Sequence, residues 1–428
     1  MIKWNTYTIG PFIHDGTWRE RIGIRHRPFR NAFGENVKEH APPSLIREIM
    51  TEFTTLTGLL PTGEVPPRRY LWTDAFAVCN FLELYRQTGD EIYQQLALRL
   101  VDQVHTVLGR HREDDPRTGW ISGLDEHEGN RHPTKGGLRI GKEMSERRPA
   151  DPVDERLEWD RDGQYYHYLT KWMHALNRVS RVTGDATYNR WAIELAKTAH
   201  AGFTFVPSFG GPKRMYWKMS IDLSYPLVPS MGHHDPLDGF ITYHQLRGTP
   251  AKDDEESMWL DLDAEIADMA YICKGKSWAT DDPLGIGGLL SDAFKVAQLI
   301  ITEDFEHTDL PEVLLDASLQ GLESWASQNP LELPADYRLA FRELGLSIGL
   351  RAVERLQGLI THNPGCFNKP NPLHAQVESL MRYAQVREDI EMFWLEHTNR
   401  EANTWTEHRD INMVMLTTSL APDGYLTL

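Results

Sequence analysis

Hydrophobic positions recur at helical spacing along most of the chain from residue 43 onward, with polar positions between them. Gly, Pro, Asn and Asp interrupt this pattern and divide it into twelve segments of helical length. The expected helices span residues 44–58, 69–89, 91–111, 162–184, 186–203, 234–248, 254–275, 286–302, 310–329, 335–358, 372–397 and 408–420. Because no stretch shows several strands in a row, the sequence predicts an all-α protein.

A short sequence repeat marks the turn inside two pairs of these helices. The stretches LYRQTGDEIYQQLA and VSRVTGDATYNRWA share Thr-Gly-Asp and, two residues later, Tyr. We expect Gly89 and Gly184 to end one helix, and Asp90 and Asp185 to cap the next, where the helix dipole also favours an acid. The repeat therefore indicates the corner of a helical hairpin, and we assign it no chemistry.

The connections between helices alternate in length. If the helices alternate between outer and inner positions, connections from an inner to an outer helix are mostly short, as at 89–90 and 184–185. Connections from an outer to an inner helix are mostly long, as at 112–161 and 204–233. In a closed ring, all the long loops lie on one face, together with the N-terminal ends of the inner helices. Because function concentrates in long loops over a rigid scaffold, we expect the site on that face.

Twelve helices that alternate in this way resemble the (α/α)6 six-hairpin superfamily. That group includes unsaturated glucuronyl and rhamnogalacturonyl hydrolases, other glycosidases, and the N-acylglucosamine and cellobiose 2-epimerases. WTDAFAVCNFLELYRQTGDEIYQQLA, followed by a loop and GWISG, looks like the first epimerase hairpin. DGQYYHYLTKWMHALNRVSRVTGDATY looks like the unsaturated-glycoside hydrolase segment in which an Asp opens an inner helix. The resemblance implies an all-α (α/α)6 toroid as a single domain over residues 1–428, with residues 1–42 as an N-terminal extension packed on it.

The composition narrows the range of partners. A formal net charge of −17 disfavours nucleic acid and anionic membrane surfaces, which are bound through Lys and Arg. We find no run of ~18 apolar residues of the kind that spans a membrane. Residues 1–19 lack the apolar core of a signal peptide, and the cysteines Cys79, Cys273 and Cys366 are odd in number and far apart. The sequence therefore favours a cytoplasmic protein whose partner is a small-molecule carbohydrate, and it leaves the oligomeric state open.

Hydrolysis of a glycosidic bond needs two carboxyl groups, one on each side of that bond. Asp74 lies inside an apolar helix beside Trp72, where a carboxylate needs a partner or a function. Asp162 occupies the position at which the hydrolase resemblance places the acid. We therefore expect a glycoside hydrolase acting on an oligosaccharide or uronide-type sugar, with Asp162 as general acid and Asp74 as the second carboxylate. Substrate contacts are expected from Trp72, Trp120, Tyr165, His167, Asp235 and Arg409.

Two other functions remain open on the sequence alone. A sugar 2-epimerase moves a proton beside a carbonyl, which suits two histidines, and His234 and His408 lie at two inner openings. A non-catalytic carbohydrate-binding or interaction toroid would use the aromatic residues without a buried acid. We expect no metal, because adjacent residues such as His233 and His234 rarely converge on one ion and no HExxH or CxxC pattern occurs. No cofactor motif is evident.

Overall fold

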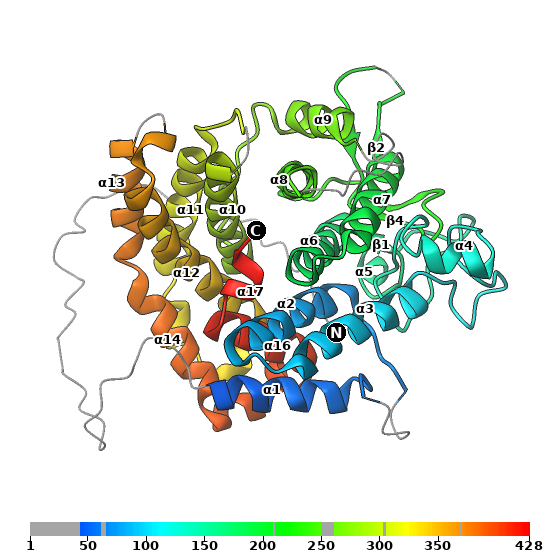
Figure 1. The fold of residues 1–428 in the computed structure, drawn as a ribbon, viewed down its shortest axis with the longest axis horizontal. Coiled ribbons are helices and arrows are strands. Elements are labelled where there is room, and N and C mark those ends of the chain that lie inside the picture. Colours follow the sequence, from blue (N-terminus) through cyan, green and yellow to red (C-terminus); the bar gives the residue numbers. More distant parts are fainter. Residues whose placement is uncertain (1–42, 61–65, 209, 250–260, 303–304, 368–369) are drawn as a thin grey trace.

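A computed structural model of the chain describes residues 43–60, 66–208, 210–249, 261–302, 305–367 and 370–428. The expected extension, residues 1–42, lies outside the described residues. The described part of the chain forms two concentric layers of helices, an (α/α)6 toroid, as expected from the sequence (Figure 1).

Six helices form the inner ring, and each of them packs against the next until the last packs against the first. In ring order they are α2 (Leu71–Thr88), α6 (Tyr166–Thr183), α8 (Asp235–Arg247), α10 (Pro283–Thr302), α12 (Ala340–His362) and α16 (Arg409–Leu420). The outer helices that cover them are α3 (Glu91–Leu108), α7 (Ala186–Phe203), α9 (Asp263–Cys273), α11 (Leu310–Ala326), the pair α13 (Pro370–Met381) and α14 (Ala384–Leu395), and α1 (Pro43–Leu56). The first outer helix α1 packs on the last inner helix α16, so the two ends of the helical array close the ring.

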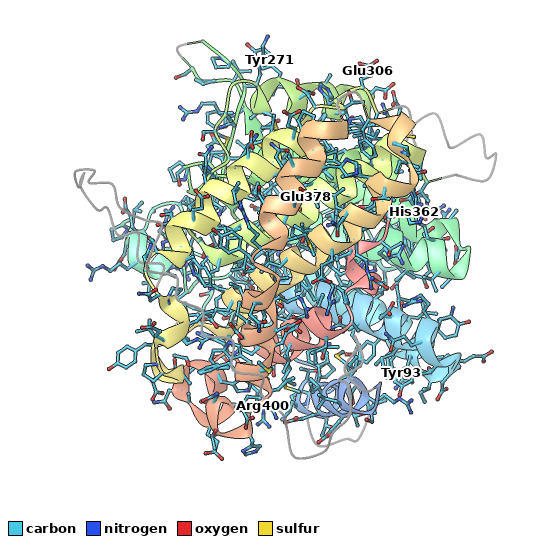
Figure 2. All side chains as sticks on the ribbon, turned by 90° about the vertical axis from the view of Figure 1, so that its left-hand side faces the viewer. Tyr93, Tyr271, Glu306, His362, Glu378 and Arg400 are labelled. Atoms are coloured by element: carbon cyan, nitrogen blue, oxygen red, sulfur yellow. The ribbon has the colours of Figure 1, made fainter. Side chains whose placement is uncertain are left out.

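The outer layer separates the apolar core from water. Figure 2 shows this layer from the side, with Glu378 of α13 on its surface. The hydrophobic residues of the outer helices, such as Leu314 and Leu322 of α11, are fully buried against the inner ring. This amphipathic arrangement is the source of the helical periodicity in the sequence.

The hairpin corners form as the repeat predicts. Gly89 and Gly184 end α2 and α6 with φ angles of 70° and 74°, a left-handed conformation that glycine adopts without strain. The Asp90 carboxylate accepts a hydrogen bond from the backbone N–H of Ile92, and the Asp185 carboxylate accepts one from the backbone N–H of Thr187. The structural interpretation of the repeat is confirmed.

Short elements decorate the loop-bearing face. The connection from α3 to α6 contains α4 (Glu126–Arg131), α5 (Glu155–Glu158) and the strand β1 (Gln164–Tyr165). The connection from α7 to α8 contains β2 (Thr204–Phe205), β3 (Arg214–Met215), β4 (Lys218–Met219) and β5 (Pro226–Val228). β1, β4 and β5 form one antiparallel sheet, which joins the two long loops to each other.

Several helix boundaries differ from the expected ones, and three of the differences change how a segment is built. α6 begins at Tyr166 and not at residue 162, because Gly163 has a φ angle of 145° and the two residues after it pair with β4. The segment expected as 372–397 is broken between α13 and α14, at residues 382–383. α12 begins at Ala340, after the separate 3-10 turn η3 (Ala335–Tyr337).

α10 is long and apolar enough to cross a membrane by length and composition, with a mean hydropathy of 1.5 over its most apolar window. In the structure it is an inner helix, and 67% of that window is buried inside the protein. Its closest neighbour is α12, where the backbones approach because Gly287 faces Gly345 and Gly349. A Cβ atom added at Gly287 would lie 2.0 Å from the carbonyl oxygen of Gly345. This contact therefore depends on the absence of side chains.

Two neighbouring glycines of α10 allow a matched test of that contact. Gly287→Ala should lower the free energy of unfolding by about 1–3 kcal/mol or more, because α10 and α12 must separate. Gly288→Ala meets nothing within 4 Å and should raise it by about 0.5–1 kcal/mol, the usual gain from replacing a helical glycine. Urea unfolding followed by circular dichroism measures both, and equal effects of the two substitutions contradict the close packing.

Candidate functional site

Charged side chains from three inner helices meet at the centre of the ring. We call them the central cluster: His167 and Lys171 of α6, Asp235 and Asp238 of α8, and Asp292 of α10. Nζ of Lys171 lies 3.1 Å from Oδ1 of Asp238, and Asp292 is hydrogen-bonded to Asp238. Nδ1 of His167 lies 3.7 Å from Oδ1 of Asp235. Residues three or four apart share one face of a helix, so α6 and α8 each present two of these groups inward.

Two side chains of the central cluster are partly exposed to solvent. The side chain of His167 is 22% exposed and that of Asp238 is 12% exposed. His167, Asp235 and Asp238 lie in the first turns of their helices, at the ends where the long loops gather. The cluster is therefore at the face that the loop lengths predict for the site.

The central cluster holds its carboxyl groups in different protonation states. Burial, together with the charge of Asp238, raises the pKa of Asp235 well above its usual range. Burial opposes ionisation of Asp238, but the Lys171 ammonium keeps the pKa of Asp238 below its ordinary value. Burial and the neighbouring Asp238 raise the pKa of Asp292 to about 7. Near neutral pH the site therefore combines an ionised Asp238 with a protonated Asp235.

His167 does not add a charge to this arrangement. Burial lowers its pKa to about 4, so the imidazole is neutral at neutral pH. A neutral imidazole beside a protonated carboxyl group can exchange hydrogen bonds with it or with a ligand. At neutral pH the central cluster therefore carries the charges of Lys171 and Asp238, and Asp292 is close to its pKa of about 7.

Aromatic side chains line the α2 side of the ring and continue into the loops. We call them the aromatic wall: Trp72, Phe76, Trp159, Tyr165 and Tyr168. The ring centroids of Trp72 and Phe76 are 4.5 Å apart, and those of Tyr165 and Tyr168 are 5.2 Å apart. Tyr165 also stacks on His167 at 5.6 Å, so the wall and the central cluster are in contact. Of the residues expected to bind substrate, Trp72, Tyr165, His167 and Asp235 therefore lie together.

The geometry does not support the catalytic role expected of Asp74. This residue lies two positions after Trp72 on α2, so at 100° per residue it points to the opposite side of the helix, away from the ring axis. Its carboxylate accepts hydrogen bonds from the Arg69 guanidinium at 3.2 Å and from the backbone N–H of Tyr70 at 2.9 Å. Asp74 thus fixes the start of α2, and its partner is Arg69, which also donates to the Thr57 carbonyl oxygen just after α1.

Asp162 also has a structural environment. Its carboxylate is fully buried and accepts hydrogen bonds from the guanidinium groups of Arg139 at 2.9 Å and Arg112 at 3.3 Å. The backbone N–H groups of Gly141 and Gly163 donate to it at 3.0 Å. Two donors on each carboxylate oxygen occupy the hydrogen-bonding positions of Asp162 with groups of the protein itself. Asp162 ties the long loop together instead of facing the axis.

Two further expected contacts lie away from the axis. Trp120 packs under α4 against Gly129, with the Arg110 guanidinium 4.4 Å above its ring. Arg409 forms an ion pair with Glu52 of α1, on the outer side of α16. Both residues were expected at the site because they are close in sequence to other candidates. In the structure Trp120 contacts Arg110 and Arg409 pairs with Glu52, away from the ring axis.

The two candidate histidines lie on opposite sides of the ring. His234 precedes α8 and His408 precedes α16, and these helices are three steps apart in a ring of six. His234 Nε2 lies 2.9 Å from the Trp278 carbonyl oxygen, and the His408 ring lies 5.8 Å from that of Phe341. Burial lowers the pKa of both histidines. They are neutral at neutral pH and could act as bases.

Sequence reasoning missed Lys171 and Asp292, and it assigned no catalytic role to Asp238, which lies at the opening of an inner helix. A signal was present, since Asp292 is an acid inside the apolar stretch LLSDAFKVAQLI, the same feature that drew attention to Asp74. Asp292 and Asp74 differ only in the side of the helix from which each projects, toward the ring axis or away from it. No three His, Cys, Asp or Glu side chains converge as metal ligands among the residues that the structure describes.

Comparisons with known proteins address the fold. No protein-family model and no curated protein sequence matches this chain. An inactive variant of the α-1,6-mannanase GH76A of Salegentibacter sp. HEL1_6, in complex with α-1,6-mannotetrose, aligns over 89% of this chain and 99% of its own, with a TM-score of 0.50 and 13% identity. The cellobiose 2-epimerase from Spirochaeta thermophila DSM 6192 aligns over 80% of this chain and 86% of its own, with a TM-score of 0.42 and 10% identity. At these identities the likeness to the mannanase shows the (α/α)6 fold alone.

The structural role of Asp162 can be measured directly. Asp162→Ala should lower the free energy of unfolding by about 3–5 kcal/mol, because it leaves buried donors and the Arg139 charge without a partner. Asp114→Ala is the control: this acid pairs with the same Arg112, but its side chain is 55% exposed, and the loss should be about 0–1 kcal/mol. An Asp162 variant that is fully stable but inactive on saccharides restores the catalytic assignment.

Proposed function

We propose that the protein is a glycoside hydrolase in which Asp235 is the general acid and Asp238 is the second carboxylate. One observation carries the proposal: α8 presents two carboxyl groups, one turn apart, in opposite protonation states at the loop-bearing face of the ring. Paired carboxyl groups whose environments separate their pKa values are the requirement of this chemistry. The proposal keeps the reaction expected from the sequence and changes the residues that perform it.

The roles follow from the contacts. Asp235 would donate its proton to the glycosidic oxygen as the bond to the leaving sugar breaks. Its Oδ2 atom is buried and has no hydrogen-bond partner within the described part of the chain, so its capacity to form a hydrogen bond is unused. Asp238, held as a carboxylate by Lys171, would attack the anomeric carbon or activate a water molecule. Residues three apart on a helix have Cβ atoms about 5–6 Å apart, which leaves room for the scissile bond between the two groups.

The surroundings of the two carboxyl groups suit a sugar. A pyranose ring presents an apolar face, and the aromatic wall beside His167 offers flat surfaces against which that face can stack. The polar side of the site supplies donors and acceptors for hydroxyl groups. The solved mannanase variant with the same fold binds an oligosaccharide, which is consistent with a saccharide substrate here.

A sugar 2-epimerase is the second candidate, supported by the positions of His234 and His408. Epimerisation removes a proton from one face of a carbon and returns it to the other, so it needs two bases on opposite sides of the sugar. α8 and α16 are opposite each other in the ring, and both imidazoles are neutral. Hydrolysis is preferred because epimerisation by two histidines gives no role to Asp235 and Asp238, of which one is protonated and the other ionised. A non-catalytic binding toroid gives it no role either.

Substitution of the two carboxyl groups tests the proposal. On any oligosaccharide that the wild type cleaves, Asp235→Asn and Asp238→Asn should each lower kcat by about 10²–10⁴-fold, with the fold intact by circular dichroism. Asp410→Asn is the control, since this acid opens the inner helix α16 on the same face but is paired with the exposed Arg68. If Asp235→Asn is fully active, the proposal is wrong. A loss of activity in Asp74→Asn then supports the acid expected from the sequence, and a loss in His408→Ala supports the pair of histidines.

The pH dependence of kcat/KM tests the part played by Asp292. This carboxyl group is protonated below its pKa of about 7 and donates a hydrogen bond to Asp238. As the pH rises through that value, a second negative charge appears beside Asp238, and activity should fall. Asp292→Asn keeps a donor but cannot ionise, so the limb near pH 7 should disappear. A limb that stays unchanged in this variant shows that Asp292 does not control the site.

A further inference from the structure

The end of the inner ring opposite the site is closed by the chain itself. After α16, residues 422–428 turn inward and include α17 (Asp423–Leu426), which lies inside the ring (Figure 1). We call these residues the floor segment. Its backbone carbonyl groups accept hydrogen bonds from Arg178 of α6, at Gly424, and from Gln298 of α10, at Leu426. A Cβ atom at Gly424 would lie 2.3 Å from the Cys79 carbonyl oxygen of α2, so the segment is seated closely against a third inner helix.

Tyr425 is the part of the floor segment that faces the site. One face of its ring stacks on Phe76 of the aromatic wall, with centroids 4.5 Å apart, and the Lys295 ammonium lies 4.4 Å from the ring centroid. The backbone oxygen of Tyr425 is 2.8 Å from Nε2 of His174, which fixes its position. Its side-chain hydroxyl group makes no hydrogen bond with any residue that the structure describes. A polar group is therefore available at the bottom of the ring.

Lys295 is a buried cation without an ion-pair partner. The residue is 4% exposed, and its ammonium forms neither an ion pair nor a hydrogen bond within the described residues. One turn away on α10, Asp292 interacts electrostatically with Lys295, but its carboxyl group is hydrogen-bonded to Asp238. Lys171, the other lysine of the ring centre, is neutralised by Asp238. A buried charge that lacks a partner is costly, and the contact with the Tyr425 ring offsets only part of that cost.

The remaining groups around Lys295 add positive charge and no anion. Arg178, from α6, donates to the carbonyl oxygen of Gly424 and forms no ion pair with a described carboxylate. His174, also from α6, is kept neutral because burial, followed by the charge of Lys295, lowers its pKa. From α2, Phe76 and Cys79 face the floor segment, and burial raises the pKa of the Cys79 thiol to about 12. The bottom of the ring is thus electropositive.

We propose that this site takes a sugar that carries an anionic group, which pairs with Lys295 and accepts a hydrogen bond from the Tyr425 hydroxyl group. The anion is a carboxylate, as in a uronic acid, or a phosphate ester on the sugar. The inference rests on the proposed function for placing a saccharide in the ring. It does not depend on which bond the enzyme breaks, because the charge complementarity concerns binding.

Matched pairs of sugars that differ in charge test this inference. Dissociation constants are measured by calorimetry for glucuronate against glucose, galacturonate against galactose, mannuronate against mannose, and glucose 6-phosphate against glucose. The wild type should bind at least one anionic sugar roughly tenfold or more tightly than its neutral counterpart. A preference confined to uronates or to phosphates identifies the source of the anion.

Variants of Lys295 assign the preference to this group. Lys295→Met keeps the length of the side chain and should abolish the preference, whereas Lys295→Arg should retain part of it. Lys135→Met, at an exposed lysine in the long loop, removes the same charge and should leave the preference unchanged. If Lys295→Met does not fold by circular dichroism, Tyr425→Phe provides the second test, with a smaller loss of affinity for the anionic sugar only.

The outcomes separate this inference from the proposed function. Equal binding of charged and neutral sugars, no binding of any anionic sugar, or a preference that survives in Lys295→Met overturns the inference. An anionic sugar that is bound through Lys295 while its glycosides are never cleaved supports the inference and contradicts hydrolysis. Cleavage of neutral oligosaccharides, without any preference for binding charged sugars, supports hydrolysis and overturns the inference.

Discussion

The ion pair between Lys171 and Asp238 is the interaction on which the chemistry of this ring depends. Two charges removed from water are costly, and they persist only where each satisfies the other at short distance. Here Nζ of Lys171 lies 3.1 Å from the Asp238 carboxylate, between two inner helices that pack directly against each other. By keeping Asp238 ionised, the pair makes a second charge at Asp235 unfavourable. Burial and this one contact between α6 and α8 thus set the protonation pattern of the site together.

The toroid provides the conditions for that contact. Its inner helices bring their N-terminal ends to one face, where the loops are long enough to add the aromatic wall and the small sheet of β1, β4 and β5. The opposite end is filled by residues 422–428, which restricts access from that side. The result is a site with a charged side formed by α6, α8 and α10, and an aromatic side formed by α2 and the loop before α6.

Most of the fold was predictable from the sequence, and the reasons are local. The helical periodicity, the Gly-Asp corners and the alternation of loop lengths each reflect interactions within a few residues, so they predicted the two layers and the face on which the candidate site lies. The catalytic assignment needed information that is not local. Asp74 and Asp162 are the kind of buried acids expected at a site, but Arg69 and Arg139 pair with them in positions that only the packing defines. Asp292 lies in the middle of an apolar helix, and its neighbour Asp238 comes from a different hairpin.

The most direct test of the account follows the atoms of water during turnover. The protein is incubated with a panel of oligosaccharides and free aldoses in D2O enriched in ¹⁸O, and the products are analysed by mass spectrometry and NMR. Hydrolysis through Asp235 and Asp238 predicts cleaved products that carry one ¹⁸O atom from water and no deuterium bound to carbon. Uncleaved sugars that acquire deuterium at C2 would contradict this account and establish proton transfer by the histidines as the reaction of the ring.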